Sequence, residues 1–375
     1  MSFKPTLQQE EIVKASVENQ MLKVNAAAGT GKTATLSLIA NANPVNSMYI
    51  AFNKSMAMEA ASKFPSHVTC KTIHSIAFGR FGRDLMHKLN RPKGKYVNVA
   101  GTSAEVGRYY HIDDIMDEYG HPAVTKAAQG LLIRQTVARY EASDSEKLHS
   151  RHVPHGAIRE LCKDGDDKVD QGMVEMIVEK ITGFAEQLWE DRQDLHSQVL
   201  ATHDTYLKLY QLSKPTLNFQ VIYLDEAQDV SDVMLDIILR QKARIILVGD
   251  SRQAIYGWRG AVNAMGKVEC ATKYLTQSFR YGQAVANVGT AIIGGEMKIQ
   301  GFDQVDSKIG MVDTSKPYTI LFRTNTALLT TAVELLREGN KVSAEVDSRD
   351  FIKLLESAGA LAEGNLKGVK HDSVV

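Results

Sequence analysis

Cysteine is scarce in this sequence, and two other common features are missing from it. The three cysteines, Cys70, Cys162 and Cys270, lie far apart without a CxxC spacing, which argues against both a disulfide framework and a zinc cluster. No apolar run approaches the length of a membrane span, and residues 1–5 carry no signal-peptide core. We therefore expect an intracellular protein, neither secreted nor bound to a membrane.

An excess of basic residues is also missing. Lys and Arg together number 44, as do Asp and Glu, so the formal net charge is zero. Nucleic-acid binders usually carry a basic excess, so a nucleic-acid site here must be a local groove rather than a whole-surface field. The length of 375 residues predicts two or three domains, and a hydrophobic content of 44% is typical of a soluble globular protein.

A loop of small residues between a predicted strand and a predicted helix is the most informative stretch. The apolar run 22–26 indicates a buried strand, residues 34–40 indicate the start of a helix, and Gly-Lys-Thr ends the loop between them. Backbone N–H groups of such a loop close around a polyphosphate, which the positive N-terminal end of the helix also attracts. Lys32 would reach the β- and γ-phosphates of ATP, and the Thr33 hydroxyl would bind Mg²⁺. The alternative is an ordinary glycine-rich turn. The loop residues expected to contact the nucleotide are Ala28, Gly29, Thr30, Gly31, Lys32 and Thr33.

Polar and aromatic residues follow two further predicted strands, 47–52 and 68–73, at the sheet edge where open α/β sheets bind ligands. These residues are Phe52, Asn53, Thr72 and His74. At this point a core role for Phe52 and a core or capping role for His74 are favoured over ligand binding. Upstream of the loop, Gln9 is either an exposed residue of a first helical turn or an amide that pairs with adenine.

A pair of carboxylates comes directly after the buried strand 219–224. Asp225 is suited to a second Mg²⁺ contact, and Glu226 to a base that orients the attacking water. A helix N-cap would explain Asp229 but not two carboxylates ahead of it. After the next strand, 244–248, Gln253 is a polar group that can touch the γ-phosphate. Five residues later come Trp258 and Arg259, the residue types that stack on an unpaired base.

The segment from about 79 to 214 has helical periodicity and reads as an insertion into the α/β domain. Its early basic cluster is either a solvated face or a phosphate-contacting surface. Further along, we predict strands at 319–322 and 341–346 and helices at 327–338 and 351–362, as expected for a second α/β unit. The basic residues are Arg80, Arg83, His87, Lys88, Arg91, Lys93 and Lys95.

Taken together, these motifs resemble those of superfamily 1 DNA helicases of the UvrD/Rep type, especially the branch with the F-box DNA helicases and phage relatives. The matching stretches are Gln9, AAAGTGKT, AFNKS, TIHS, LDEAQD, VGDSRQAIYGWRGA, LTQSFRY and LFRTN. Two departures are visible. Ala26 stands where the general loop motif has its first glycine, and Ala34 replaces a basic residue that many relatives have.

The resemblance implies an α/β fold with a RecA-like parallel-sheet domain, a helical insertion and part of a second RecA-like domain. The corresponding ranges are 1–85 with 214–280, then 86–213, then 281–375. It implies that Gln9 contacts adenine and that Phe279 stacks on it, while Gln253 and Arg280 touch the γ-phosphate. The DNA track would comprise Phe52, Asn53, Thr72, His74, Trp258 and Arg259. ATP and Mg²⁺ are the implied cofactors, single-stranded DNA and DNA junctions the implied partners, and 3′ to 5′ the implied direction.

Two motifs that relatives carry in the second RecA-like domain, one with an arginine finger, do not occur after Asn325. We therefore expect an N-terminal portion of a longer helicase, with impaired hydrolysis by itself. The leading hypothesis is an ATP-driven DNA helicase or translocase. The alternatives are an ATP-regulated single-stranded-DNA-binding regulator without unwinding activity and an unrelated P-loop ATPase such as a nucleotide kinase. Intact Glu226, Gln253 and Arg280 count against the former, and Trp258 with Arg259 against the latter.

Overall fold

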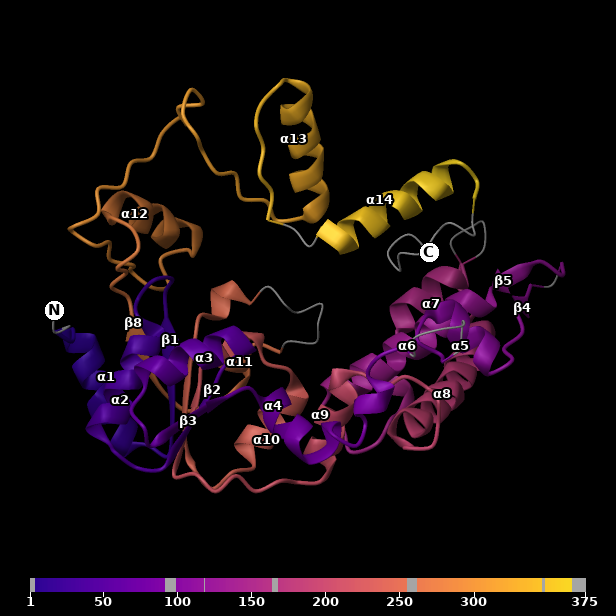
Figure 1. Ribbon diagram of the computed structural model, residues 1–375, viewed down its shortest axis with the longest axis horizontal. Coiled ribbons are helices and arrows are strands. Elements are labelled where there is room, and N and C mark those ends of the chain that lie inside the picture. Colours follow the sequence, from indigo (N-terminus) through magenta and orange to yellow (C-terminus); the bar gives the residue numbers. More distant parts are fainter. Residues whose placement is uncertain are drawn as a thin grey trace. The chain divides into compact units, whose positions relative to one another are not determined.

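The computed structural model describes residues 4–91, 99–117, 119–163, 168–254, 262–345 and 348–365 (Figure 1). The chain divides into two compact units, Met1–Lys308 and Ile309–Val375, and each is described by itself. No helix within the described residues combines the length and the apolar character that crossing a membrane requires.

The first unit is built on a six-stranded sheet with the strand order β3-β2-β6-β7-β1-β8, and every strand pair in it is parallel. This arrangement confirms the predicted α/β class with a parallel sheet. The sequence explains it, because a strand covered on both faces needs an uninterrupted apolar run such as Val221–Leu224. The strands are β1 (Met21–Ala26), β2 (Ser47–Ile50), β3 (Val68–Lys71), β6 (Val221–Leu224), β7 (Arg244–Gly249) and β8 (Ala271–Leu275).

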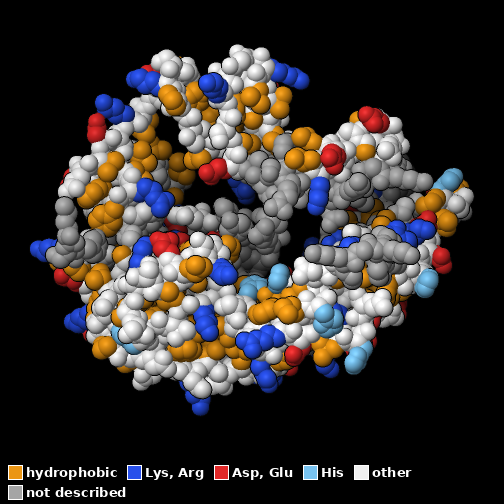
Figure 2. Space-filling model, viewed as in Figure 1, with side chains coloured by type: hydrophobic (Ala, Val, Ile, Leu, Met, Phe, Trp, Pro, Cys, Tyr) orange, Lys and Arg blue, Asp and Glu red, His pale blue; other side chains and the backbone are white. Residues whose placement is uncertain are grey.

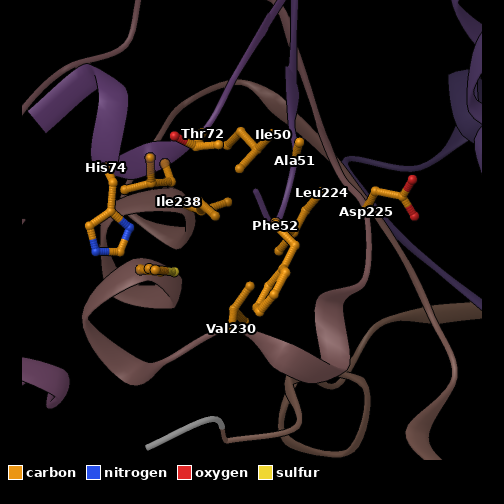
Figure 3. A pocket seen from close by; sticks show the side chains of 11 residues that line it. Ile50, Ala51, Phe52, Thr72, His74, Leu224, Asp225, Val230 and Ile238 are labelled. Atoms are coloured by element: carbon orange, nitrogen blue, oxygen red, sulfur yellow. The ribbon is translucent and has the colours of Figure 1, made fainter. Parts of the chain in front are cut away.

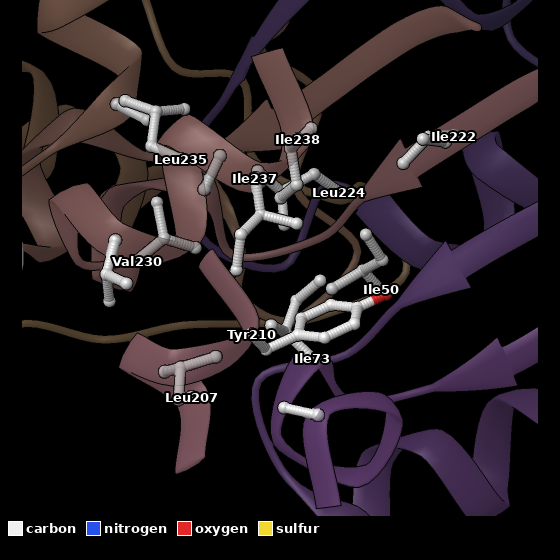
Figure 4. Close-up of a cluster of buried hydrophobic side chains, with 14 of the residues drawn as sticks. Ile50, Ile73, Leu207, Tyr210, Ile222, Leu224, Val230, Leu235, Ile237 and Ile238 are labelled. Carbon is white, nitrogen blue, oxygen red and sulfur yellow. The ribbon is translucent and has the colours of Figure 1, made fainter. Parts of the chain in front are cut away.

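Alternation along each strand divides its side chains between two hydrophobic cores. Along β6, Val221 and Tyr223 pack into the core under the first three helices, whereas Ile222 and Leu224 enter the core on the opposite face. Figure 4 shows this second core. The helices of the first core are α1 (Leu7–Glu18), α2 (Lys32–Ala42) and α3 (Lys54–Lys63). The second core is covered by α4 (Ile73–Ala77), α9 (His203–Leu212), α10 (Asp232–Leu239) and α11 (Ala264–Lys267).

A third hydrophobic core lies in the mostly helical segment that interrupts the sheet in sequence. The helices of this segment gather beside the α/β part in Figure 1. The segment also contains a short antiparallel pair of strands, β4 and β5. The helical character agrees with the sequence, while the domain boundaries stay predictions. The elements are α5 (Ser103–Tyr109), β4 (Ile115–Met116), β5 (Pro122–Val124), α6 (Lys126–Ala142), α7 (His155–Leu161) and α8 (Gln171–Gln193).

Beyond β8, the first unit adds α12 (Gln283–Ile292), and the second unit contains α13 (Asn325–Arg337) and α14 (Ser348–Ala362). These two helices agree with the predicted ones to within three residues. The strand predicted at 319–322 is wrong, and residues 341–345 of the other predicted strand are not a strand either. Ile320 and Leu321 are exposed, and no strand occurs among the described residues of this unit to pair with them. A parallel strand cannot form without such a neighbour.

Candidate nucleotide site and nucleic-acid interface

The predicted phosphate loop runs between β1 and α2. Gly29 and Gly31 have φ values of 75° and 78°, which an L-residue rarely adopts, and the Thr30 hydroxyl closes the loop by donating to the Ala27 carbonyl at 2.8 Å. Gly31 caps α2 without a side-chain hydrogen bond, so the helix begins with backbone N–H groups directed into the loop. This is the local geometry that binds anions.

The segment after β8 closes one side of the loop. The Phe279 backbone N–H donates to the Gly29 carbonyl at 2.8 Å, and the Ser278 hydroxyl donates to the Ala28 carbonyl at 2.9 Å. The Ser278 oxygen also accepts from the backbone N–H of Arg280 at 3.2 Å. These bonds hold Phe279 and Arg280, which are predicted nucleotide contacts, against the loop, although about 250 residues separate them from it in sequence.

A cavity of about 470 Å³ lies over the loop, a volume suited to a nucleotide-sized ligand. Most of its lining residues are polar or are glycines with accessible backbone. Of the predicted nucleotide residues, Gln9, Ala28, Asp225 and Gln253 do not line it. The lining residues are Gly29, Thr30, Gly31, Lys32, Thr33, Ala34, Glu226, Phe279 and Arg280.

Asp225 is the buried carboxylate of the site. One of its oxygens, Oδ2, accepts hydrogen bonds from the Thr33 hydroxyl at 2.9 Å and from the Tyr49 hydroxyl at 2.6 Å, and Oδ1 accepts from the Glu226 backbone N–H at 3.0 Å. Burial raises the pKa of Asp225, while the hydrogen bond from Tyr49 opposes that shift. Thr33 and Asp225, predicted to share a metal ion, therefore lie in direct contact.

Sequence reasoning missed Tyr49. Tyr49 lies on β2, directly opposite Tyr223 of β6, and Tyr223 precedes Asp225 by two residues. Burial raises the pKa of the Tyr49 hydroxyl. Its role depends on the neighbouring strand, so no local motif could have revealed it.

Glu226 has a left-handed backbone with φ at 51°, a conformation that is costly for a residue with a side chain. Its carboxylate forms an ion pair with the Lys32 ammonium and accepts a hydrogen bond from the Gln228 amide at 2.9 Å. The strained turn thus directs the carboxylate over the loop, as strain at functional sites often does.

Gln253 lies outside the cavity. It belongs to a short helical turn, η5 (Ser251–Gln253), and its amide donates to Asp250 Oδ2 at 2.8 Å. Asp250 in turn accepts from the Arg252 backbone N–H at 3.1 Å. The predicted contact of Gln253 with the γ-phosphate stays a prediction.

Gln9 is fully buried beneath the loop. Its amide oxygen accepts from the Thr6 backbone N–H at 3.0 Å, completing a capping box at the start of α1, and its Nε2 donates to the Thr35 hydroxyl at 3.0 Å. A methyl group added to Gly31 would lie 3.5 Å from Nε2. Gln9 is therefore close to the loop, and the capping hydrogen bond by itself explains the position of its side-chain oxygen.

The candidate DNA residues of β2 and β3 lie at the predicted sheet edge. Figure 3 shows Phe52, Thr72 and His74 around one small pocket, with the Asp225 carboxylate pointing away from it. Asn53 caps α3 and Thr72 caps α4, each by accepting a backbone N–H, so both side chains have a structural role. Trp258 and Arg259 lie outside the described residues.

His74 connects α4 to α9. Its Nε2 lies 3.2 Å from Asp204 Oδ1 on α9, and this hydrogen bond lowers the pKa of Asp204. Beside it, a groove of about 910 Å³ is bordered by α3, α4 and α9. Two cationic side chains, Lys54 and Lys71, and an aromatic one, Tyr206, are among its lining.

Part of the predicted basic cluster supports the fold rather than an open surface. Lys88 is buried and donates to the backbone carbonyls of Asp191 and Asp194, and Arg91 is ion-paired with buried Glu105 at 2.7 Å. Lys93 and Lys95 lie outside the described residues. Figure 2 shows Lys and Arg side chains scattered over the visible face, as the zero net charge leads one to expect.

A parallel sheet, a glycine loop that opens a helix and two carboxylates at the end of a neighbouring strand define a P-loop nucleotide-binding domain. The sequence matches the family described as "UvrD/REP helicase N-terminal domain" over residues 6–267, which is more than half of its length. The chain belongs to this family, and its sheet is the RecA-like sheet that the resemblance implied.

Named relatives point the same way. The chain is similar to F-box DNA helicase 1 of Gallus gallus, with 36% identity over 304 residues that cover 77% of this chain and 28% of the relative. It is 30% identical over 359 residues to F-box DNA helicase protein 1 of Schizosaccharomyces pombe, covering 88% of this chain and 39% of the relative. An ATP-dependent DNA helicase PcrA of Staphylococcus aureus is 26% identical over 174 residues, covering 42% and 24%. The chain thus spans well under half the length of these relatives.

Proposed function

We propose that this chain contributes the ATP-binding part of a DNA helicase or translocase that moves along single-stranded DNA and unwinds duplex DNA. The observation that carries the proposal is the convergence on one loop of Lys32 with Glu226 and of Thr33 with Asp225. A cation, a hydroxyl and two carboxylates in contact at a phosphate loop are the groups that phosphoryl transfer needs.

ATP is the proposed nucleotide, with its phosphates in the cavity over the loop. The N–H groups at the start of α2 and the Lys32 ammonium would hold the phosphate oxygens. Thr33 and Asp225 offer neighbouring oxygen ligands of the kind that Mg²⁺ prefers, and burial of Asp225 favours a cation beside it. Mg²⁺ would neutralise charge on the phosphates.

Glu226 is the proposed base that orients the attacking water. A polyphosphate in the loop would compete for the Lys32 ammonium, which now pairs with Glu226, and would leave that carboxylate free to accept a proton. Arg280 lines the same cavity and supports a γ-phosphate contact. Phe279 offers an aromatic ring on which the adenine of ATP would stack. This ring packs edge-on against the Phe302 ring, with centroids 5.5 Å apart.

Single-stranded DNA and DNA junctions are the proposed partners, along the edge that carries Phe52, Asn53, Thr72 and His74. The groove beside His74, with Lys54, supports a local rather than a whole-surface site. The family resemblance alone supports a DNA contact by Trp258 and Arg259 and movement in the 3′ to 5′ direction.

The experiment is ATP hydrolysis by the 375-residue chain under single-turnover conditions, with and without single-stranded DNA. Lys32→Ala should weaken binding of a fluorescent ATP analogue, whereas Glu226→Gln should bind it normally and abolish hydrolysis, because the shape is kept and the base is lost. Lys63→Ala is the matched control, since Lys63 pairs on the surface with Glu59.

Each outcome separates one proposal from its competitors. Near-normal turnover by Glu226→Gln would refute the role of Glu226. Binding of ATP and DNA without any hydrolysis would favour the regulator, and hydrolysis indifferent to DNA would favour an unrelated ATPase.

A further inference from the structure

Gln228 is a buried glutamine in the turn η4 (Ala227–Asp229), immediately after the two carboxylates of the site. Its Nε2 donates to Glu226 Oε2 at 2.9 Å and to Asp229 Oδ2 at 3.0 Å. Its Oε1 accepts from the backbone N–H of Asp250 at 3.1 Å. One amide therefore joins the end of β6 to the end of β7.

The amide occupies space that a neighbouring side chain would otherwise need. A methyl group added to Gly249, the last residue of β7, would lie 2.5 Å from Gln228 Oε1. Gly249 therefore leaves room for the amide to reach the backbone of Asp250. Amides are also the side chains that can donate to a carboxylate and accept from a backbone N–H at once, as both partners here require.

We propose that Gln228 is a positioning residue that fixes the Glu226 carboxylate over the phosphate loop and ties it to the turn that carries Gln253. The N–H of Gln228 holds the same Glu226 oxygen that pairs with Lys32. Asp250, held through its backbone, accepts from the Gln253 amide at 2.8 Å, so the carboxylate and the predicted phosphate sensor share one anchor. This inference rests on the proposed role of Glu226 in ATP hydrolysis.

The principal variant is Gln228→Met, which keeps the size of the side chain and removes both ends of the amide. We expect kcat for ATP hydrolysis to fall about 10- to 100-fold, because a misplaced reacting group costs about that much. The Kd for Mg·ATP should change less than about threefold, since the loop that binds phosphates is left intact. Gln241→Met is the matched control: Gln241 is a buried glutamine whose amide bonds to Leu217, Pro215 and Ile237, remote from the cavity.

A double variant tests whether Gln228 acts through Glu226. If it does, adding Gln228→Met to Glu226→Gln should leave the small residual single-turnover rate of Glu226→Gln unchanged, because the group that it positions is already lost. Multiplying losses would overturn the inference, as would a kcat drop no larger than that of Gln241→Met.

Gly249→Ala provides the second route should Gln228→Met fail to fold. The added methyl group displaces the amide without removing it, and we expect the same loss of kcat with the same nearly unchanged Kd. Gly183→Ala is its control, because a methyl group there meets nothing within 4 Å. Normal kcat in a folded Gly249→Ala chain would overturn the inference while the proposed function stands, whereas near-normal turnover by Glu226→Gln would overturn the role of Glu226 on which the inference rests.

Discussion

Gly29 is the position in the phosphate loop where one added methyl group should do the most damage. Its φ is +75°, and a Cβ there would lie 2.6 Å from the Cβ of Arg280 and 2.8 Å from the Oγ of Ser278. Both separations are too short for real atoms, so in Gly29→Ala the loop or the facing segment must move. Either movement strains the 2.8 Å hydrogen bond from the Phe279 N–H to the Gly29 carbonyl.

The expected magnitude has two parts. A left-handed backbone costs an L-residue about 1–2 kcal/mol, and overpacking costs about 1–3 kcal/mol. Gly29→Ala should therefore lower the free energy of unfolding by about 2–5 kcal/mol. Because the displaced segment carries Arg280 and Phe279 in the wall of the cavity, nucleotide affinity should fall at least about tenfold, or 1.4 kcal/mol.

Urea unfolding measures the first quantity, and titration with a fluorescent ATP analogue measures the second. Gly295→Ala is the control, because Gly295 has nearly the same φ, +76°, and nothing lies within 4 Å of an added methyl group. That variant should show the backbone cost alone. If Gly29→Ala lost no more stability than Gly295→Ala and bound nucleotide normally, the reasoning from the contact with Arg280 would be refuted.

Three further predictions concern other parts of the chain. Tyr49→Phe removes a donor from buried Asp225 and should cost about 1.5–3 kcal/mol in urea unfolding, with weaker Mg²⁺-dependent nucleotide binding; equal stability would contradict it. Burial lowers the pKa of Lys208 to about 8, so between pH 8 and 10.5 this side chain binds more protons in the unfolded chain, and its own contribution to stability should rise with pH by at most about 1.4 kcal/mol per unit, whereas buried groups with a raised pKa, such as Cys70, contribute with the opposite sign. Lys208→Met should remove that rise, and an unchanged slope in urea unfolding would contradict this. Trp258→Ala should cost about 1–3 kcal/mol of single-strand affinity in an anisotropy titration; unchanged affinity with a large loss of melting temperature would instead indicate a core residue.

The sequence predicted the parallel sheet, and it predicted residues of the candidate nucleotide site that lie together in the structure, where the signal is local. A strand, a glycine loop and a helix start are adjacent in the chain, so the contact of Thr33 with Asp225 followed from two short motifs. The approach of Phe279 to Gly29 needed the family resemblance, because 250 residues separate the two and nothing in either stretch encodes the pairing. The geometry of the DNA candidates Trp258 and Arg259 stays a prediction.

Residues whose role depends on a partner in another element were missed or misread. Tyr49 stands in no motif, and Gln228 stands in LDEAQD without a role that the motif assigns to it, yet each holds a carboxylate of the site. Lys88 looked like a surface cation, but three donors on its ammonium let it satisfy carbonyls at the end of α8 from within the core. The strand predicted at 319–322 had the right composition, but strand formation is decided by neighbours as much as by propensity.

The two candidate sites share one edge of the sheet, which constrains how they can communicate. Asp225 follows β6 and Phe52 follows β2, and the Asp225 backbone N–H donates to the Ile50 carbonyl at 3.2 Å. One strand further, the Ala51 N–H donates to the Lys71 carbonyl at 3.0 Å, one residue before Thr72. Displacement of Asp225 by a ligand would therefore act on the same backbone that carries Phe52 and Thr72. A short path of ladder bonds thus joins the two candidate sites, and we expect coupling between the proposed nucleotide and DNA sites to follow it.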